Sequence, residues 1–113
     1  MSDPTIDAAA YAELQESAGA EFTRELVDTF LEEAPPMLEQ LHRALDAGEA
    51  ERFRRTAHSL KSNGQTFGAV ALTERARALE LGGLEAGRAP EALAGLEQEY
   101  ARVATALREL RDA

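Results

Sequence analysis

Hydrophobic residues along the chain recur every three or four positions, which is the spacing of amphipathic helices. The last segment has the most regular pattern, with successive steps of three, four, three, four and three residues through Leu93, Leu96, Tyr100, Val103, Leu107 and Leu110. No segment shows the sustained apolar–polar alternation of a strand. Alanine, leucine, glutamate and arginine dominate, and all four favour helices. The pattern therefore predicts an all-α fold.

Glycine, proline and capping residues predict where the first helices begin and end. A short helix is expected over residues 7–17, with Asp7 as its N-cap and Gly19 just beyond its end. A long helical stretch follows over residues 19–47, and Pro35-Pro36 predicts a kink or a restart within it. The apolar positions of this stretch are Phe22, Leu26, Phe30, Leu38, Leu41 and Leu45.

Three further helices are predicted, over residues 50–65, over residues 68–81 and from Pro90 to the C-terminus. Gly82-Gly83 and residues 87–90 are expected to form the loop before the last helix, with Pro90 in its first turn. Four long helices with short connections predict an antiparallel up-down four-helix bundle, preceded by the short N-terminal helix. The length of 113 residues fits a single domain over residues 1–113.

Charge and composition exclude several classes of protein. The formal net charge is −9, from 21 acidic and 12 basic residues, so binding of nucleic acid through the overall field is not expected. There is no cysteine, which excludes disulfides and thiolate metal sites. No apolar run is long enough to span a membrane, and Met1-Ser2-Asp3-Pro4 lacks the features of a signal peptide. We therefore expect a cytoplasmic protein that binds no membrane.

The helix over residues 50–65 presents an unusual polar face around His58. Its apolar stripe consists of Phe53, Ala57, Leu60, Gly64 and Phe67. On a helical wheel, His58 lies roughly 140° from the centre of this stripe. Arg54, Lys61 and Gln65 share its side, and Ser62 lies next to them. Arg54 and Lys61 are one turn away in either direction and can therefore reach the imidazole.

The surroundings of His58 are also free of acidic residues. From Arg52 through Thr73 there is no aspartate or glutamate, whereas Arg52, Arg54, Arg55 and Lys61 are all basic. Such a patch suits a dianion such as a phosphoryl group. A neutral imidazole can attack phosphorus while its other nitrogen keeps a proton on an acceptor, and an ammonium can neutralise the phosphoryl oxygens. An ordinary solvated helix face explains the same residues, so both interpretations remain open at this point.

The segment from Ala57 to Ala69 resembles the signature of the histidine-phosphotransfer (HPt) domain of bacterial phosphorelays. That signature runs Ala-His-x-Leu-Lys-Gly-Ser, then an apolar residue and Gly-Ala. Here His58, Lys61 and Gly68 match it. Further similarity upstream, at residues 30–35 and 45–49, and downstream, at Leu72 and Leu79-Glu80, extends the resemblance from about Leu14 to the C-terminal helix. It implies a helical bundle with the histidine exposed on one helix.

The resemblance also implies roles for individual residues. His58 would be the phosphorylated nucleophile, Lys61 would stabilise the phosphoryl charge, and Glu80 would orient the imidazole by accepting the hydrogen bond of its second nitrogen. A solvated helix charge is the alternative for Glu80. Ser62 replaces a glycine that is usual in the family, where the backbone lets a partner approach. The residues expected near the phosphoryl group or a docked partner are Arg54, Arg55, Ser62 and Gln65.

The predicted function is that of a phosphorelay intermediate. His58 would accept a phosphoryl group from a receiver-domain aspartate or a kinase and pass it to a response-regulator aspartate. The partners would be receiver domains of response regulators or hybrid histidine kinases. The sequence has no glycine-rich phosphate loop for ATP, so we expect a phosphocarrier rather than an enzyme, without cofactor or metal.

Two alternatives remain open at this stage. One is a non-catalytic helical adaptor that binds or sequesters a receiver, and the other is the phosphoacceptor fragment of a chemotaxis-type kinase. The start at Met1 and the charged last helix favour a free-standing protein, which we expect to be monomeric. His42, the other histidine, has no cationic cluster around it and is expected to be a surface residue without a role.

Overall fold

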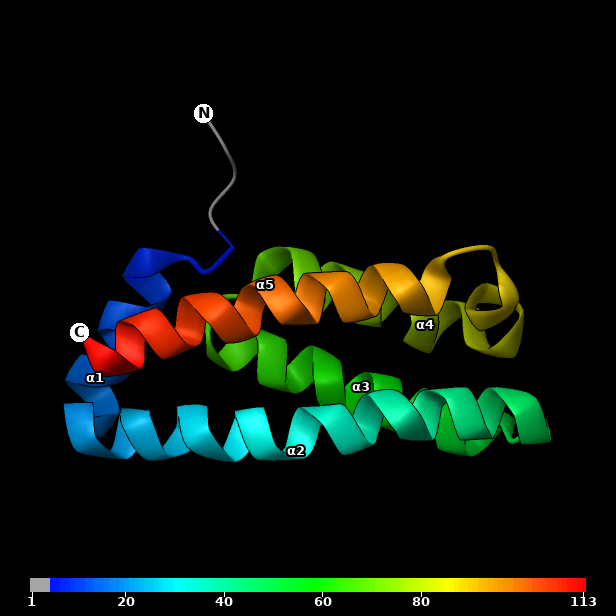
Figure 1. The fold of residues 1–113 in the computed structure, drawn as a ribbon, viewed down its shortest axis with the longest axis horizontal. Helices are drawn as coiled ribbons and strands as arrows, with labels where there is room; N and C mark the ends of the chain where they lie inside the picture. The colour runs from blue at the N-terminus through cyan, green and yellow to red at the C-terminus, as the bar shows by residue number, and fades with distance from the viewer. Residues whose placement is uncertain (1–4) are drawn as a thin grey trace.

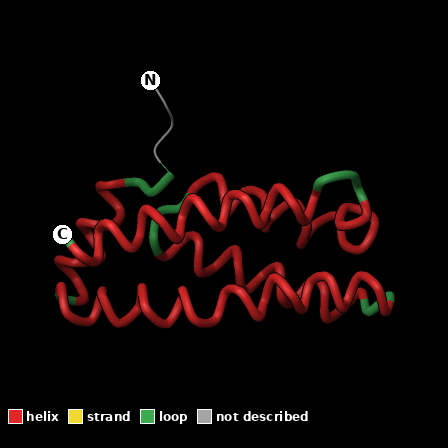
Figure 2. Tube along the Cα trace, viewed as in Figure 1, coloured by secondary structure: helices red, strands yellow, loops and turns green. Residues whose placement is uncertain are grey.

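The computed structural model describes residues 5–113, and this part of the chain is helical almost throughout, with no strand (Figure 2). The first four residues, where the signal-peptide features were sought, lie outside the described residues. The elements are α1 (Ala8–Ala18), α2 (Ala20–Ala47), α3 (Ala50–Thr66), α4 (Val70–Arg88) and α5 (Ala92–Asp112). The predicted all-α fold is confirmed.

Helices α2 to α5 form an antiparallel bundle in which each helix runs back along the one before it (Figure 1). Each packs against its neighbour in the chain, and α5 returns to contact α2, which closes the bundle. The short helix α1 packs against α2. Its N-cap is Asp7, as predicted, and the Asp7 carboxylate accepts a hydrogen bond from the backbone N–H of Ala9 at 2.9 Å.

The predicted apolar stripes face the core, with one exception. The stripe of α3 is buried along its whole length, and Phe53, Ala57 and Leu60 are inaccessible to solvent. Phe22, however, is 51% exposed, so this apolar position of α2 does not face the core. Thr23 occupies the inward position instead, and its hydroxyl donates to the carbonyl of Gly19 at 2.7 Å. Because Phe22 is the residue directly before Thr23 on the helix, its side chain points outward.

Of the kink or restart predicted at Pro35-Pro36, the restart is wrong, because helix α2 continues through both prolines. Both prolines are exposed. The carbonyls of Leu31 and Glu32, four residues earlier, lose their helical donors but can bind solvent on this face. Because the buried side of the helix is undisturbed, its core residues stay in register on both sides of the prolines.

Helix α4 extends beyond its predicted end at Leu81 as far as Arg88. Its backbone leaves helical geometry at Gly83, where φ is 66° and ψ is −153°, and then resumes. The predicted glycine loop is therefore a break within α4, and the connection to α5 is shorter than expected. Gly87 is buried, and a Cβ atom there would lie 2.6 Å from the Cζ atom of Phe53. The added turn thus packs closely on the ring of Phe53.

Helices α3 and α4 approach each other most closely at Gly64. A Cβ atom on Gly64 would lie 2.6 Å from the Thr73 hydroxyl oxygen and 3.4 Å from the Thr73 backbone nitrogen. That hydroxyl cannot easily move, because it donates a buried hydrogen bond to the carbonyl of Ala69 at 2.8 Å. A glycine is therefore required at position 64 for the two helices to pack at this distance.

We expect Gly64→Ala to lower the free energy of unfolding by about 1–3 kcal/mol, because the added methyl group overpacks the α3–α4 contact. Gly95→Ala is the matched control. There the new Cβ atom would meet only the movable end of the Arg75 side chain, at 2.5 Å from Nη1. This control should raise stability by about 0.5–1 kcal/mol through helix propensity. Urea unfolding measures the free energy of unfolding of both variants. Equal stabilisation by Gly64→Ala and Gly95→Ala would contradict the close approach of α3 to α4 at Gly64.

Candidate functional site

His58 lies on the outer side of α3, and 55% of its side chain is exposed. Its Nδ1 atom is 2.7 Å from the Oε2 atom of Glu80, which comes from the neighbouring helix α4. Glu80 is far less accessible, with 13% of its side chain exposed. The contact that the family resemblance implies between these two residues is therefore present, and the carboxylate lies between the imidazole and the protein interior.

The second oxygen of Glu80 contacts Lys61. Its Oε1 atom lies 2.8 Å from the Lys61 Nζ atom, and 19% of the lysine side chain is exposed. Lys61 follows His58 by one turn of α3, so one carboxylate from α4 bridges two neighbouring side chains of α3. We call His58, Lys61 and Glu80 the bridged cluster.

The two cationic or donating neighbours keep Glu80 ionised. The hydrogen-bonding contact with Lys61 lowers the pKa of the Glu80 carboxyl most, and the hydrogen bond with His58 lowers it further, against a smaller opposing effect of burial. An ionised carboxylate only accepts hydrogen bonds, so Nδ1 of His58 must carry the donated proton. In the neutral imidazole the lone pair is then on Nε2, which has no partner among the described residues.

The remaining predicted site residues differ in what they contact. Arg54 forms an ion pair with Glu51 on the same helix, so it is engaged there rather than with His58. Arg52 is paired in the same way with Glu49, at 3.2 Å. The basic patch is thus partly neutralised at its start by acidic residues just upstream of the acid-free segment. Arg55 has no ion-pair partner in residues 5–113, and its charge remains available.

Ser62 and Gln65 lie on the same helix, further towards its C-terminus. The carbonyl of Ser62 accepts a hydrogen bond from the Thr66 hydroxyl at 3.1 Å, and the serine side chain is half-buried. Gln65 is exposed and borders a surface hollow between α3 and α4. Arg77, which was not predicted from the sequence, lines the same hollow from α4. Only the register of the two helices brings Arg77 to this face.

Gly68, the glycine of the signature, has a structural role in the turn after α3. Its φ is +70°, in the left-handed region that disfavours other residues. Its carbonyl accepts a hydrogen bond from the backbone N–H of Asp7 at 2.8 Å, and a Cβ atom there would lie 2.7 Å from that of Ala10. Gly68 therefore joins the start of α1 to the α3–α4 turn, a contact between distant segments that helical spacing does not predict.

His42 lies apart from the bridged cluster, on α2, with its Nε2 atom 3.3 Å from the Oε1 atom of Glu97 on α5. In the part of the chain that the structure describes, no three potential metal-ligating side chains gather at one place. None of the helices formed by residues 5–113 has the length and apolarity needed to cross a membrane.

Comparisons with known proteins identify relatives of the chain as a whole. The family model of the Hpt domain matches residues 25–113. The crystal structure of histidine-containing phosphotransfer protein B (HptB) from Pseudomonas aeruginosa PAO1 is similar to this chain, with a TM-score of 0.88. The two are 35% identical, and the similarity covers 98% of this chain and 97% of that one. The search of curated proteins found no match.

The bridged cluster makes a prediction about the titration of Glu80. The titration midpoint of the Glu80 carboxyl should lie below the ordinary value of 4.5. Lys61→Met should raise this midpoint more than His58→Gln does, because the lysine is the larger cause of the lowered pKa. The stability that this carboxylate contributes should be present above its unfolded-state pKa and lost as the pH falls through the lowered folded-state value. NMR titration of the Glu80 side-chain carboxyl carbon measures each midpoint.

Arg54→Met is the control for this titration, because it removes a cation of α3 that pairs with Glu51 rather than with Glu80. It should leave the Glu80 midpoint unchanged. A midpoint that rises equally in the Arg54 and Lys61 variants would show that the general charge of α3, and not the bridging contact, lowers the Glu80 pKa.

Proposed function

Because the chain belongs to the Hpt domain family, we propose that it is a phosphorelay intermediate in which His58 accepts a phosphoryl group from a receiver-domain aspartate or a kinase and passes it to a response-regulator aspartate. Hpt proteins are phosphocarriers that exchange phosphoryl groups with receiver domains of kinases and response regulators. The observation that carries the assignment to His58 is its exposed imidazole, whose Nδ1 atom is bound to Glu80.

The proposed transfer needs no change in the position of the Nδ1 proton. The Nε2 lone pair attacks the phosphorus of an aspartyl phosphate, an N–P bond forms, and the P–O bond to the aspartate breaks. The aspartate leaves as a carboxylate. The phosphorylated ring then carries a positive charge, which the Glu80 carboxylate stabilises through the hydrogen bond at Nδ1. Transfer to the next aspartate is the same step in reverse.

In this mechanism Lys61 stabilises the charge of the phosphoryl oxygens. Its ammonium has three N–H donors, and the contact with Glu80 accounts for one of them. The lysine lies one turn from His58 and is held by the same carboxylate, so the remaining donors are available near the imidazole. Hydrogen-bond donors held in this position lower the free-energy barrier of phosphoryl transfer, because they point to where negative charge develops in the transition state.

Arg54, Arg55, Ser62 and Gln65 belong to the proposed docking face around His58. Arg55 is the strongest candidate of the four for a partner contact, because Arg54 is already paired with Glu51. Ser62, in place of the usual glycine, adds a small polar side chain to this face. We further propose that residues 1–113 act as a single monomeric module in the cytoplasm, without cofactor or metal. The proposed module has no nucleic-acid or membrane partners. Composition and charge are the basis for these parts of the proposal.

Incubation with a phosphorylated receiver should place an acid-labile, base-stable label on the chain, and His58→Gln should abolish it. His42→Gln is the matched control and should be labelled like the unchanged protein, because His42 lies on α2 against Glu97. Label that persists in the His58 variant would contradict the assignment. Receiver binding without any label on the unchanged protein would favour an adaptor.

Replacement of Lys61 by methionine should slow transfer from a saturating receiver by about 10- to 100-fold, the loss expected when a charge-assisted contact is removed. Lys61→Arg keeps the positive charge and should recover part of the rate. Rapid-quench measurement of phosphorylated His58 at saturating receiver concentration separates this effect from weaker docking. A rate for the methionine variant equal to that of the unchanged chain would rule out the proposed role of Lys61.

A further inference from the structure

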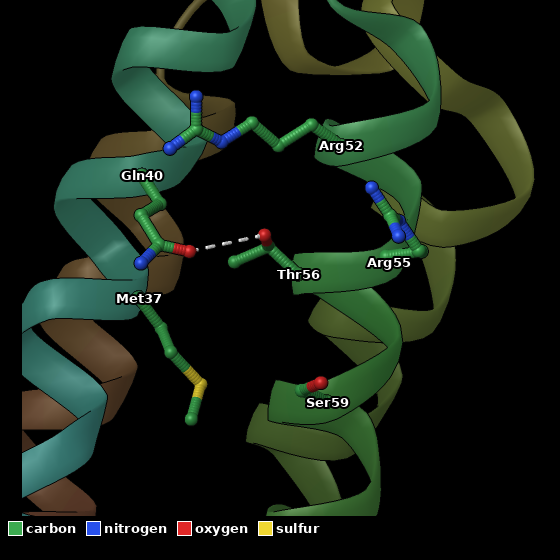
Figure 3. Close-up of a pocket in the computed structure, with 6 residues that line it drawn as sticks. All are labelled: Met37, Gln40, Arg52, Arg55, Thr56 and Ser59. Carbon is green, nitrogen blue, oxygen red and sulfur yellow. Dashed lines mark hydrogen bonds between the residues drawn. The ribbon is translucent and has the colours of Figure 1, made fainter.

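A polar groove lies between α2 and α3 (Figure 3). Its volume is about 420 Å³, and the residues that line it are Met37, Gln40, Arg52, Arg55, Thr56 and Ser59. Figure 3 shows Arg52 extending from α3 across the groove toward α2. The bridged cluster lies at the contact of α3 with α4, so the groove is a separate feature on the α2 side of α3.

The lining of the groove is positively charged although the protein is strongly acidic. It contains two guanidinium groups and no carboxylate, on a chain with a net charge of −9. Arg55 has no ion-pair partner among the described residues. Arg52 contacts Glu49 through Nη1, which leaves other N–H donors of its guanidinium free. The groove therefore suits an anion that can accept several hydrogen bonds.

Polar groups along the wall between the helices add further hydrogen-bonding capacity. Thr56 is almost fully buried, and its hydroxyl lies 3.5 Å from the Oε1 atom of Gln40, the long limit for a hydrogen bond. So weak a contact leaves both groups able to bind an incoming side chain. The Ser59 hydroxyl lies on the same side of α3, one turn from Arg55 and next to His58 in sequence.

The groove and the proposed docking face adjoin each other on α3. At 100° per residue, Arg55 and Ser59 lie about 60° and 100° round the helix from His58 on one side, and Lys61 lies about 60° round on the other. A macromolecular partner that covers His58 therefore also reaches the rim of the groove. A small phosphate donor, in contrast, needs to approach only the imidazole.

We propose that this groove binds an acidic side chain of the same receiver partner that exchanges phosphoryl groups with His58, and that Arg52 and Arg55 thereby help to select the partner. This inference rests on the proposed function. A chain with nine excess negative charges repels acidic partners in general, so a local carboxylate site favours those receivers that present an acid at the matching position. The groove thus acts on docking, whereas the bridged cluster acts on transfer.

The test compares the double variant Arg52→Ala/Arg55→Ala with Arg43→Ala/Arg108→Ala, which removes the same charge from exposed positions on α2 and α5. The probe is the phosphorylated receiver that labels the unchanged chain fastest in a panel. The groove variant should raise the KM for this receiver about tenfold with kcat within about twofold, and should weaken the salt dependence of KM. The control variant should keep both KM and kcat within about twofold of the values for the unchanged chain.

A second variant, Ser59→Asp, fills the groove with a carboxylate one turn from Arg55 and keeps both arginine side chains. It should raise KM in the same way. Phosphorylation of His58 by phosphoramidate, a small donor that needs no docking, should fall much less than transfer from the receiver in every variant. Circular dichroism and urea unfolding check that the variants fold.

An unchanged KM in the groove variant, or an equal rise in the control, would overturn the inference while leaving the proposed function intact. A fall in phosphoramidate labelling as large as the fall in transfer from the receiver would overturn it as well, because the arginines would then act on the chemistry of His58. Absence of receiver-dependent label on the unchanged chain, with labelling by phosphoramidate retained, would instead contradict the proposed function itself.

Discussion

The close contact between Gly64 and Thr73 sets the distance between α3 and α4, and the geometry of the site depends on that distance. Glu80 is about two turns along α4 from Thr73, and His58 is nearly two turns along α3 from Gly64. Because both helices are rigid over this length, the position of the glutamate beneath the imidazole follows from the packing at the glycine. The buried stripe of α3 then holds the opposite side of the same helix against the core.

The bridged cluster combines orientation and charge in one carboxylate. A neutral amide at position 80 could also accept the Nδ1 hydrogen bond, but it would give Lys61 no counter-charge. The ionised glutamate does both, since one oxygen faces the imidazole and the other faces the ammonium. In the proposed cycle the same group fixes the tautomer before transfer and stabilises the charged ring afterwards.

Most of the fold was predictable because apolar spacing reports directly on the buried side of each helix. Predictions failed where the effect of a single residue, such as a proline or an apolar side chain, depends on which side of the helix it occupies. Pro35 and Pro36 are tolerated because they face solvent, and Phe22 is exposed because Thr23 takes the inward position. At the site, the pairing of Arg54 with Glu51 could have been inferred from their spacing of three residues. The bridge from Glu80 to Lys61 could not, because it depends on the register between two helices.

Lys61 of the bridged cluster also affects how the chain should respond to dissolved salt. In the unphosphorylated chain its ammonium already neutralises Glu80, so the site has its own counter-ion before any phosphoryl group arrives. In the proposed cycle the ammonium is shared with the incoming dianion while the imidazolium takes over part of the neutralisation of Glu80. Charges that the chain carries itself then neutralise part of the phosphoryl charge on this side of the complex. Dissolved salt should therefore act on the encounter between the two proteins and leave the chemical step within their complex nearly unaffected.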